Sequence, residues 1–349
     1  MATTETVQIS HTQAQGAQQL MQMASGFIFT ASLYPIAKLK IADLLADGPL
    51  PVTELAQKTG SNADALYRVL RLLASAGVFA ESAGKVFALT PVSDCLRADA
   101  PGSMRDMVIW MGNRFHFKVW SEMSYSIETG QPAVEHVYGM RAFEAIFGDP
   151  EIAYDFNMAM TCFSRQIAPA LLESYDFSGI GTLMDVAGGH GAILCEVLSR
   201  YPGMKGILFD MTNVIEEATC HICSLKMDQR CETVTGNFFD EIPAGADAYY
   251  MQHIIHDWAD EPALKILANC RRALEGVKDG RLLVVDSVVP ETSEPHFSKI
   301  LDLEMLLMPG GRERTEGEWR ELFAKAGFEI TRIVPMQAAE SVIEARVRS

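Results

Sequence analysis

The chain has 349 residues, 48% hydrophobic and 21% charged, and its 29 basic and 45 acidic residues give a net charge of −16. This is ordinary globular composition, with enough chain for two domains. An acidic chain repels phosphate backbones and anionic lipids, which argues against nucleic acid and membrane partners. The most apolar run, residues 26–36, is shorter than the roughly 20 residues of a membrane span. We expect no export signal, and a frayed tail over the polar first dozen residues.

Seven scattered cysteines, from Cys95 to Cys270, do not form a disulfide framework and indicate a reduced, cytoplasmic enzyme or regulator. Cys220 and Cys223 have the spacing of zinc ligands, with His221 and Cys231 nearby. Structural zinc sites usually pair two such motifs, and no second one is present. Small residues on a helix explain them better, so we predict no metal site.

The first hundred residues read as short helices followed by two strands. The patterns predict helices over 15–24, 34–45, 51–60 and 63–74, and strands over 78–80 and 86–89. Helix, turn, helix and hairpin is the order of a winged helix. Its usual function is DNA binding, but the second helix offers only Arg68 and Arg71 in an acidic protein. Dimerisation or scaffolding is therefore favoured for residues 1–105.

Residues 106–349 form the second predicted domain. Its early segments 104–123 and 152–175 are helical and rich in Met and aromatic residues, which suit a core or an apolar pocket. From Thr182 onward strands alternate with helices, which is typical of a doubly wound, Rossmann-like α/β sheet. We expect strands over 183–186, 206–209, 233–235, 248–251 and 282–285, helices such as 192–200 and 263–274, and an antiparallel hairpin over 328–347.

The first strand–helix turn of this domain is rich in glycine. Residues 187–191 read Ala-Gly-Gly-His-Gly, with Gly188, Gly189 and Gly191 letting the backbone approach a ligand closely. Asp210 ends the second strand, where a carboxylate can accept hydrogen bonds from both ribose hydroxyls of a nucleoside. Together they indicate an adenosine-type cofactor, either NAD or S-adenosylmethionine. A solvated loop carboxylate is the alternative for Asp210.

Two further strand ends carry candidate ligand-binding residues. Asn237 follows the third strand and could bind an adenine edge, while Phe238 could pack on the ring; a β-turn with a core aromatic is the alternative. At the fourth strand, the period of two puts Gln252 and His253 on opposite faces. His256 lies beyond the strand, on the turn, where a general base is more often found.

Two acidic residues later in the chain lie at comparable positions, one at a strand end and one in a loop. Asp286 ends the fifth strand, and Glu313 lies in a glycine-led loop, Gly310–Thr315. A carboxylate bonded to one ring nitrogen orients a histidine base and fixes its tautomer. The alternatives are a helix cap or loop acid for Asp286, and an ion pair with Arg312 or Arg314 for Glu313.

These motifs occur in one order, and in that order the chain resembles a known enzyme family. The turn at 185–191, Phe209-Asp210, Gly236-x-Phe-Phe239, His256-Asp257-Trp258 and Gly-Gly-Arg-Glu-Arg-Thr at 310–315 resemble S-adenosylmethionine-dependent O-methyltransferases of the caffeic acid and acetylserotonin O-methyltransferase type. The resemblance extends over nearly the whole chain. It implies that the N-terminal domain forms an intertwined homodimer.

The resemblance implies roles for particular residues. His256 would be the general base, flanked by Asp286 and Glu313, and Asp210 would bind the ribose. S-adenosylmethionine would be held by one set of residues: Ala187, Gly188, Gly189, Gly191, Asp210, Asn237, Phe238 and Gln252. Our candidates for an apolar clamp on a small aromatic acceptor are Phe156, Met160, Phe163, Trp258, Met305 and Met308.

The chain departs from the family pattern at several positions. Ala187 replaces a glycine, which keeps close approach possible if its φ is negative. Asn237 replaces an aspartate and Gln252 a lysine, so two charges near the cofactor are absent. Phe163 stands near the place of a histidine, and one residue is missing before Gly310. These last changes argue against plant phenylpropanoid acceptors.

The implied reaction is an in-line methyl transfer to a phenolic hydroxyl, with His256 accepting its proton and no metal needed. Two other classes remain open. A nicotinamide dehydrogenase would share the glycine turn and Asp210, but would leave the carboxylates around His256 unexplained. A ligand-sensing winged-helix regulator would share the N-terminal half. Some members of the resembled family have also lost or altered methyl transfer.

Overall fold

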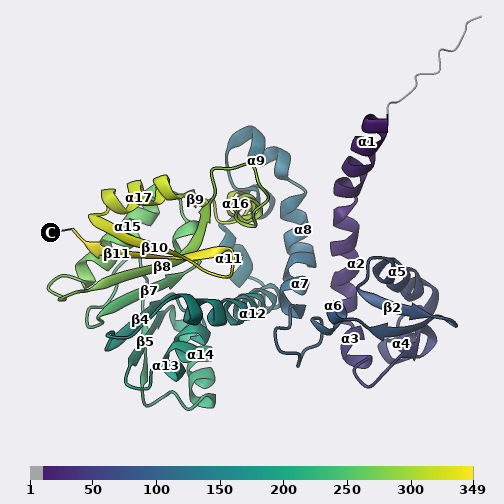
Figure 1. Ribbon diagram of the computed structural model, residues 1–349, viewed down its shortest axis with the longest axis horizontal. Coiled ribbons are helices and arrows are strands. Elements are labelled where there is room, and N and C mark those ends of the chain that lie inside the picture. The colour runs from purple at the N-terminus through teal and green to yellow at the C-terminus, as the bar shows by residue number, and fades with distance from the viewer. Residues whose placement is uncertain (1–10, 349) are drawn as a thin grey trace, which may run out of the picture. The chain divides into compact units, whose positions relative to one another are not determined.

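The computed structural model describes residues 11–348, which leaves most of the expected N-terminal tail outside the described residues. The chain divides into two compact units, and the division falls between His116 and Phe117. Each unit has its own hydrophobic core and is described separately below (Figure 1).

The N-terminal unit combines helices with a small sheet. The helices are α1 (His11–Ala24), α2 (Gly26–Lys38), α3 (Ile41–Leu44), α4 (Val52–Thr59), α5 (Ala63–Ser75), α6 (Pro91–Asp94) and α7 (Arg105–Gly112). The antiparallel sheet has the order β1 (Leu50–Pro51), β3 (Val86–Leu89), β2 (Phe79–Ser82). Asn62 caps α5 as expected for its residue type, because its side-chain oxygen accepts the backbone N–H groups of Asp64 and Ala65.

Two details of this unit differ from the prediction. The helix expected over 34–45 is interrupted at Lys40, which has a φ of +55° and separates α2 from α3. A residue in this left-handed region cannot continue a right-handed helix. The short strand β1 was missed because it has only two residues, one of them a proline, which carries no strand pattern.

The stretch Thr12–Lys38 is long and apolar enough to cross a membrane by length and composition alone. The apolar run named from the sequence, residues 26–36, is only part of this stretch, and one such helix is weak evidence for a membrane span. The stretch includes α1 and α2, which expose six large apolar side chains in this unit: Leu20, Met21, Met23, Phe27, Ile28 and Phe29.

The C-terminal unit has the predicted doubly wound sheet. Its strands are β4 (Thr182–Val186), β5 (Lys205–Asp210), β6 (Cys231–Thr235), β7 (Ala248–Gln252), β8 (Arg281–Val289), β9 (Arg314–Thr315), β10 (Phe328–Pro335) and β11 (Glu340–Val347). Seven follow the order β10-β11-β8-β7-β4-β5-β6, and β9 pairs with the end of β8. β4 to β8 are parallel, whereas β10 and β11 form the expected antiparallel hairpin. The predicted fold class is confirmed.

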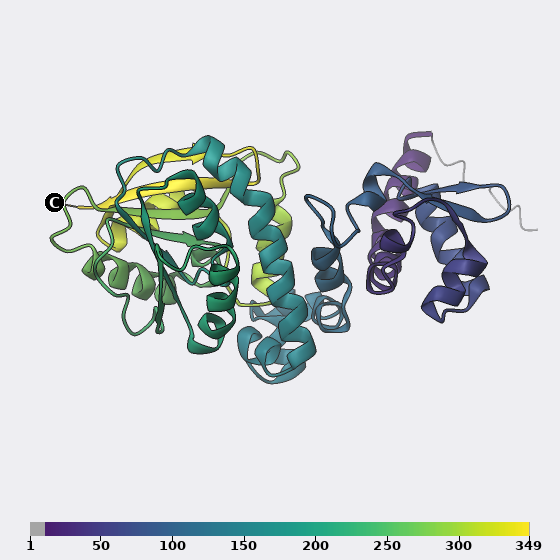
Figure 2. The ribbon, with the colours of Figure 1, turned by 90° about the horizontal axis from the view of Figure 1, so that it is seen from below.

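Helices cover both faces of this sheet. They are α13 (Ala192–Arg200), α14 (Thr212–Ser224), α15 (Asp260–Ala273) and α17 (Glu316–Lys325), with α12 (Pro150–Ser174) beside α13 (Figure 2). The remaining elements are α8 (Arg114–Trp120) at the boundary of the units, α9 (Met123–Thr129), α10 (Ala133–Tyr138), α11 (Ala142–Phe147), α16 (Ser298–Leu307) and the 3₁₀ turn η1 (Ile255–Asp257).

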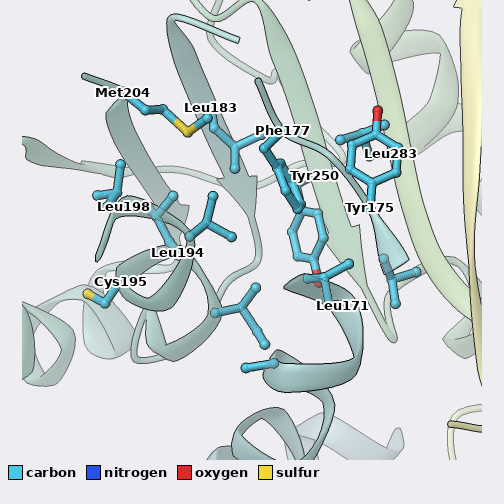
Figure 3. Packing of buried hydrophobic residues seen from close by; sticks show 14 of the residues in the cluster. Leu171, Tyr175, Phe177, Leu183, Leu194, Cys195, Leu198, Met204, Tyr250 and Leu283 are labelled. Carbon is cyan, nitrogen blue, oxygen red and sulfur yellow. The ribbon is translucent and has the colours of Figure 1, made fainter. Parts of the chain in front are cut away.

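The strands carry near-continuous apolar runs because each face of the sheet is buried. In β7, Tyr250 belongs to the core under α12, α13 and α14, whereas Tyr249 and Met251 belong to the core under α15 and α17. Figure 3 shows the first of these cores, where Tyr250 packs close to Leu171 and Phe177. The two cores bury both faces of the sheet, and the loops at its carboxyl edge carry the candidate residues.

Candidate active site

The carboxyl ends of the parallel strands bring the candidate residues to one edge of the sheet. β4 pairs with β5 on one side and β7 on the other, so the turn after β4 lies between Asp210 and the histidine segment. Open α/β sheets bind their ligands in the crevice at this edge.

The glycine turn after β4 has left-handed backbone at three positions. Ala187, Gly189 and Gly191 have φ values of +58°, +57° and +75°. The negative φ on which close approach at Ala187 was made conditional is not found. The N–H of Ala187 bonds to the carbonyl of Phe209, and the turn has a conformation that is costly for alanine. A Cβ at Gly188 would overlap the carboxyl group of Asp185, so that position needs glycine.

Asp210 is half-buried and bonded to backbone amides. Its carboxylate accepts the N–H of Gly189 at 2.9 Å and the N–H of Met211 at 2.7 Å, which ties β5 to the glycine turn. Burial raises the pKa of Asp210, and the two amides oppose that shift. A Cβ at Gly189 would meet no atom within 4 Å, so the turn borders open space. Asp210 therefore places a carboxylate beside a glycine turn that borders open space, an arrangement that fits a ribose-containing ligand.

The remaining cofactor candidates are held by local bonds. The side-chain oxygen of Asn237 accepts the N–H of Phe239 at 2.9 Å, which is the turn geometry considered as its alternative. Gln252 accepts the hydroxyl of the buried Tyr250 at 2.7 Å. Trp258 packs edge-on against Phe238, with ring centroids 6.1 Å apart. The candidate clamp residue Trp258 therefore lies beside a candidate cofactor residue.

His256 lies in η1 and is bonded to Glu313. Its Nδ1 is 2.6 Å from Oε1 of Glu313, and both residues are 3% exposed. The ion pairs considered as alternatives do not form, because Arg312 pairs with Glu318 and Arg314 with Asp260. A carboxylate on Nδ1 leaves Nε2 as the nitrogen that can take a proton.

The loop that carries Glu313 is docked directly onto the backbone of the histidine turn. The N–H of Arg312 donates to the carbonyl of His256 at 2.8 Å, and the N–H of Glu313 donates to Asp302 at 2.8 Å. A Cβ on Gly311 would overlap that same carbonyl of His256. Glycine at 311 therefore allows the close approach that brings Glu313 to the ring.

The protonation of the pair follows from its burial. Burial lowers the pKa of His256 and raises the pKa of Glu313 to about 8. Both shifts disfavour charge in this site. Above the pKa of Glu313, with Glu313 ionised and His256 neutral, Nδ1 carries the ring proton. Nε2, which lies 3.5 Å from Oδ1 of Asp257, then has the lone pair that can take a proton.

The second histidine, His253, is also among carboxylates. Its Nδ1 is 3.9 Å from Asp286 and its Nε2 is 3.5 Å from Glu340, while its ring centroid is 4.9 Å from that of His256. Asp286 is completely buried in β8, so neither a helix cap nor a loop acid describes it. The sequence argument missed Glu340, which lies 54 residues beyond Asp286 with no motif around it and reaches the site only through the pairing of β11 with β8.

Ligand atoms of His253, His256 and Asp286 lie within 4.8 Å of one another, close enough to hold a metal ion. Within residues 11–348 this is the one group with such spacing, and the Cys220–Cys223 segment is not part of it. All seven cysteines are free, with Cys220 and Cys223 exposed and Cys231 buried.

The apolar clamp candidates lie on three elements of the C-terminal unit. Phe163 of α12 lies 5.0 Å from the ring of His253. Phe156 and Trp258 both contact Phe143, at 6.2 Å each. Met305 and Met308 are buried at the end of α16, and Met160 is half-buried on α12. The structure thus brings Phe163 to the histidines and joins Phe156 to Trp258 through Phe143.

The fold and this edge define a class of protein: an α/β protein with a glycine-rich turn beside an acidic strand end and a buried histidine–carboxylate pair. An O-methyltransferase domain model matches residues 120–329, and an O-methyltransferase dimerisation domain model matches residues 21–99. The chain therefore belongs to the S-adenosylmethionine-dependent O-methyltransferase family.

Individual relatives methylate different small molecules. Phenazine O-methyltransferase PhzM of Lysobacter antibioticus is 42% identical over 94% of this chain and 95% of its own. An 8-amino-8-demethylriboflavin N,N-dimethyltransferase of Streptomyces davaonensis is 36% identical over 96% and 97%. Among solved structures, human N-acetylserotonin methyltransferase in complex with SAM has a TM-score of 0.88 at 26% identity, covering 98% of this chain and 100% of that one.

Proposed function

We propose that the protein transfers a methyl group from S-adenosylmethionine to a phenolic hydroxyl of a small aromatic acceptor, in the cytoplasm, with His256 as general base. The observation that carries the proposal is the 2.6 Å contact between Nδ1 of His256 and Glu313, which presents Nε2 as a proton acceptor. A phenol with a pKa of about 10 is a poor nucleophile at neutral pH and needs such a base. A solved relative, NcsB1, is in complex with SAM and a hydroxynaphthoic acid, which supports the acceptor class.

The residues have distinct tasks in this mechanism. Asp210 and the turn 187–191 hold the cofactor, which supplies an electrophilic methyl group on a sulfonium. Phe163 and the other apolar side chains orient the acceptor ring. Nε2 of His256 takes the hydroxyl proton, and Glu313 stabilises the resulting imidazolium through Nδ1. Base catalysis of this kind contributes roughly 10²–10⁴-fold.

The test of the function uses cofactor labelled in its methyl group. Purified protein is incubated with a panel of phenols, catechols, hydroxyquinones and matched aromatic amines, with EDTA in parallel. We expect label in a phenolic ether, at the same rate with EDTA. Label only on nitrogen would replace the acceptor class by an amine, as in the relative that is an N,N-dimethyltransferase. Loss of activity in EDTA would assign a metal to His253, His256 and Asp286.

The identity of the cofactor is tested at Asp210. We expect Asp210→Ala to weaken S-adenosylhomocysteine binding at least about tenfold, because hydrogen bonds to a charged group contribute roughly 1.5–3 kcal/mol each. Calorimetry measures the affinity, with NAD as the competing ligand. Asp247→Ala is the matched control, since Asp247 also accepts two backbone N–H groups, but at the opposite end of β4. Tight NAD binding would support the dehydrogenase alternative instead.

The pH dependence of turnover follows from the His256–Glu313 pair. Below the pKa of about 8 that burial gives Glu313, the pair holds one proton more than the base form. Activity should therefore rise with pH through the neutral range and level off near that value. A turnover rate independent of pH between 6 and 9, measured with saturating acceptor, would exclude this base.

The exposed apolar side chains of α1 and α2 predict a homodimer, in keeping with the dimerisation domain that matches residues 21–99. Light scattering should give twice the mass of 38.4 kDa at micromolar concentration. Phe27→Glu, at a side chain 62% exposed, should shift the protein toward monomer. A monomeric wild type that floats with lipid vesicles would favour a membrane role for this stretch, and a gel shift with DNA would favour a winged-helix regulator.

A further inference from the structure

His253 lies in an unusual backbone position next to the proposed base. It follows the last residue of β7 and has a φ of +54°, which non-glycine residues rarely adopt. Its N–H donates to the carbonyl of Val285 at 3.2 Å, so the main chain is held against β8. Strained positions of this kind persist where the surroundings over-determine them, and they cluster at functional sites.

The side chain of His253 bridges two buried carboxylates from different strands. Asp286 comes from β8 and Glu340 from β11, and the two residues are neighbours because Glu340 pairs with Ser287 in the sheet. Asp286 is 0% exposed and Glu340 3% exposed. Neither oxygen of Asp286 has a hydrogen-bond partner among the described residues. A buried carboxylate without a bonded partner is costly unless a positive charge lies near it.

We propose that His253 is a positioning residue: a cation held between Glu340 and Asp286 that keeps Asp286 ionised and close to His256. Asp286 then stabilises the imidazolium that forms on His256 during proton transfer. This inference rests on the proposed function, because it assigns His253 a role only through the base.

The charges around His253 support this arrangement. Burial lowers the pKa of His253, but Glu340, Asp286 and Glu313 outweigh burial and raise it. Burial raises the pKa of Glu340, and the His253 ring 3.5 Å away brings it below its usual range. Both partners thus shift as an ion pair does. The titratable groups that act on His253 are His256 and Asp257 from η1, Asp286 from β8, Glu313 from the loop before β9, and Glu340 from β11. Arg314 acts on His256, Asp286 and Glu313.

The test is a double-mutant cycle of His253→Gln and Asp286→Asn, read as the pH profile of kcat. Loss of the cation raises the pKa of the remaining acidic groups. His253→Gln should therefore move the low-pH rise of the kcat profile, its acid limb, upward by about one pH unit. If His253 acts through Asp286, His253→Gln should add less than about twofold to the loss already present in Asp286→Asn. The acceptor KM and the affinity for S-adenosylhomocysteine should stay near wild type.

Glu344→Gln is the matched control. Glu344 is a buried carboxylate of β11, like Glu340, but it bonds to Tyr175 and Arg332. Its acid limb should stay in place. Additive losses in the cycle with an unmoved limb would overturn the inference and leave His253 a structural residue. If His256→Gln retains turnover, the proposed function fails. If that variant is inactive while His253→Gln matches wild type, only this inference fails.

Discussion

His256→Ala is expected to lose about 10²–10⁴-fold in turnover and to keep its affinity for S-adenosylhomocysteine. The base acts on the acceptor proton, whereas Asp210 and the glycine turn hold the cofactor. Glu313→Gln should cost less turnover, because it removes the negative charge beside Nδ1 of His256 and leaves the ring in place. Turnover comes from labelled-methyl transfer and affinity from calorimetry.

The control for this variant cannot be His253. From the sequence we expect His253→Ala to cost little turnover, but the structure places that ring between two buried carboxylates. His221→Gln is a better control, since His221 lies on α14. An active His256 variant beside an inactive His253 variant would mean that the base is assigned to the wrong histidine. If both stay active on an acidic acceptor, positioning alone drives the transfer.

Gly311→Ala should have the second largest effect, although residue 311 carries no chemical group. Its new Cβ would overlap the backbone of His256 and Asp257, which cannot move aside as a flexible side chain can. The loop must withdraw, taking Glu313 with it, and a shift of about 1 Å in a catalytic group costs roughly 10²-fold. Cofactor affinity should change little, because the glycine turn is a separate segment.

The control for Gly311→Ala is Gly317→Ala. Gly317 is the next glycine along the chain, and a Cβ there would meet only Thr315, at 4.0 Å. It should therefore keep both turnover and thermal stability. Equal activity in the two variants would show that the loop tolerates displacement and that Glu313 does not orient the base.

The fold could be predicted because its main signals are local. The alternation of strands and helices after Thr182 and the hairpin at 328–347 need only neighbouring residues to be seen. The misses depend on contacts that a short stretch of sequence does not contain. The break at Lys40 and the positive φ at Ala187 are backbone conformations of ordinary residues, set by surrounding packing and bonds, and residue type does not indicate them.

Only the site residues that lie in recognisable sequence motifs could be predicted. Strand ends identified His256, Asp286 and Asp210, and the glycine-led loop identified Glu313. The docking of Gly311 on His256 and the arrival of Glu340 depend on strand pairing between distant segments. No pattern within a short window contains that information.

The separation of His256 from Glu313 along the chain has a consequence for synthesis. The two residues lie 57 positions apart, and Glu340 comes later still. A nascent chain can complete the glycine turn and its neighbouring strands well before Glu313 leaves the ribosome. A chain that stops before residue 313 also lacks Trp319, Phe323 and Phe328 of the core under α15 and α17. We therefore expect it neither to pack the sheet nor to transfer a proton.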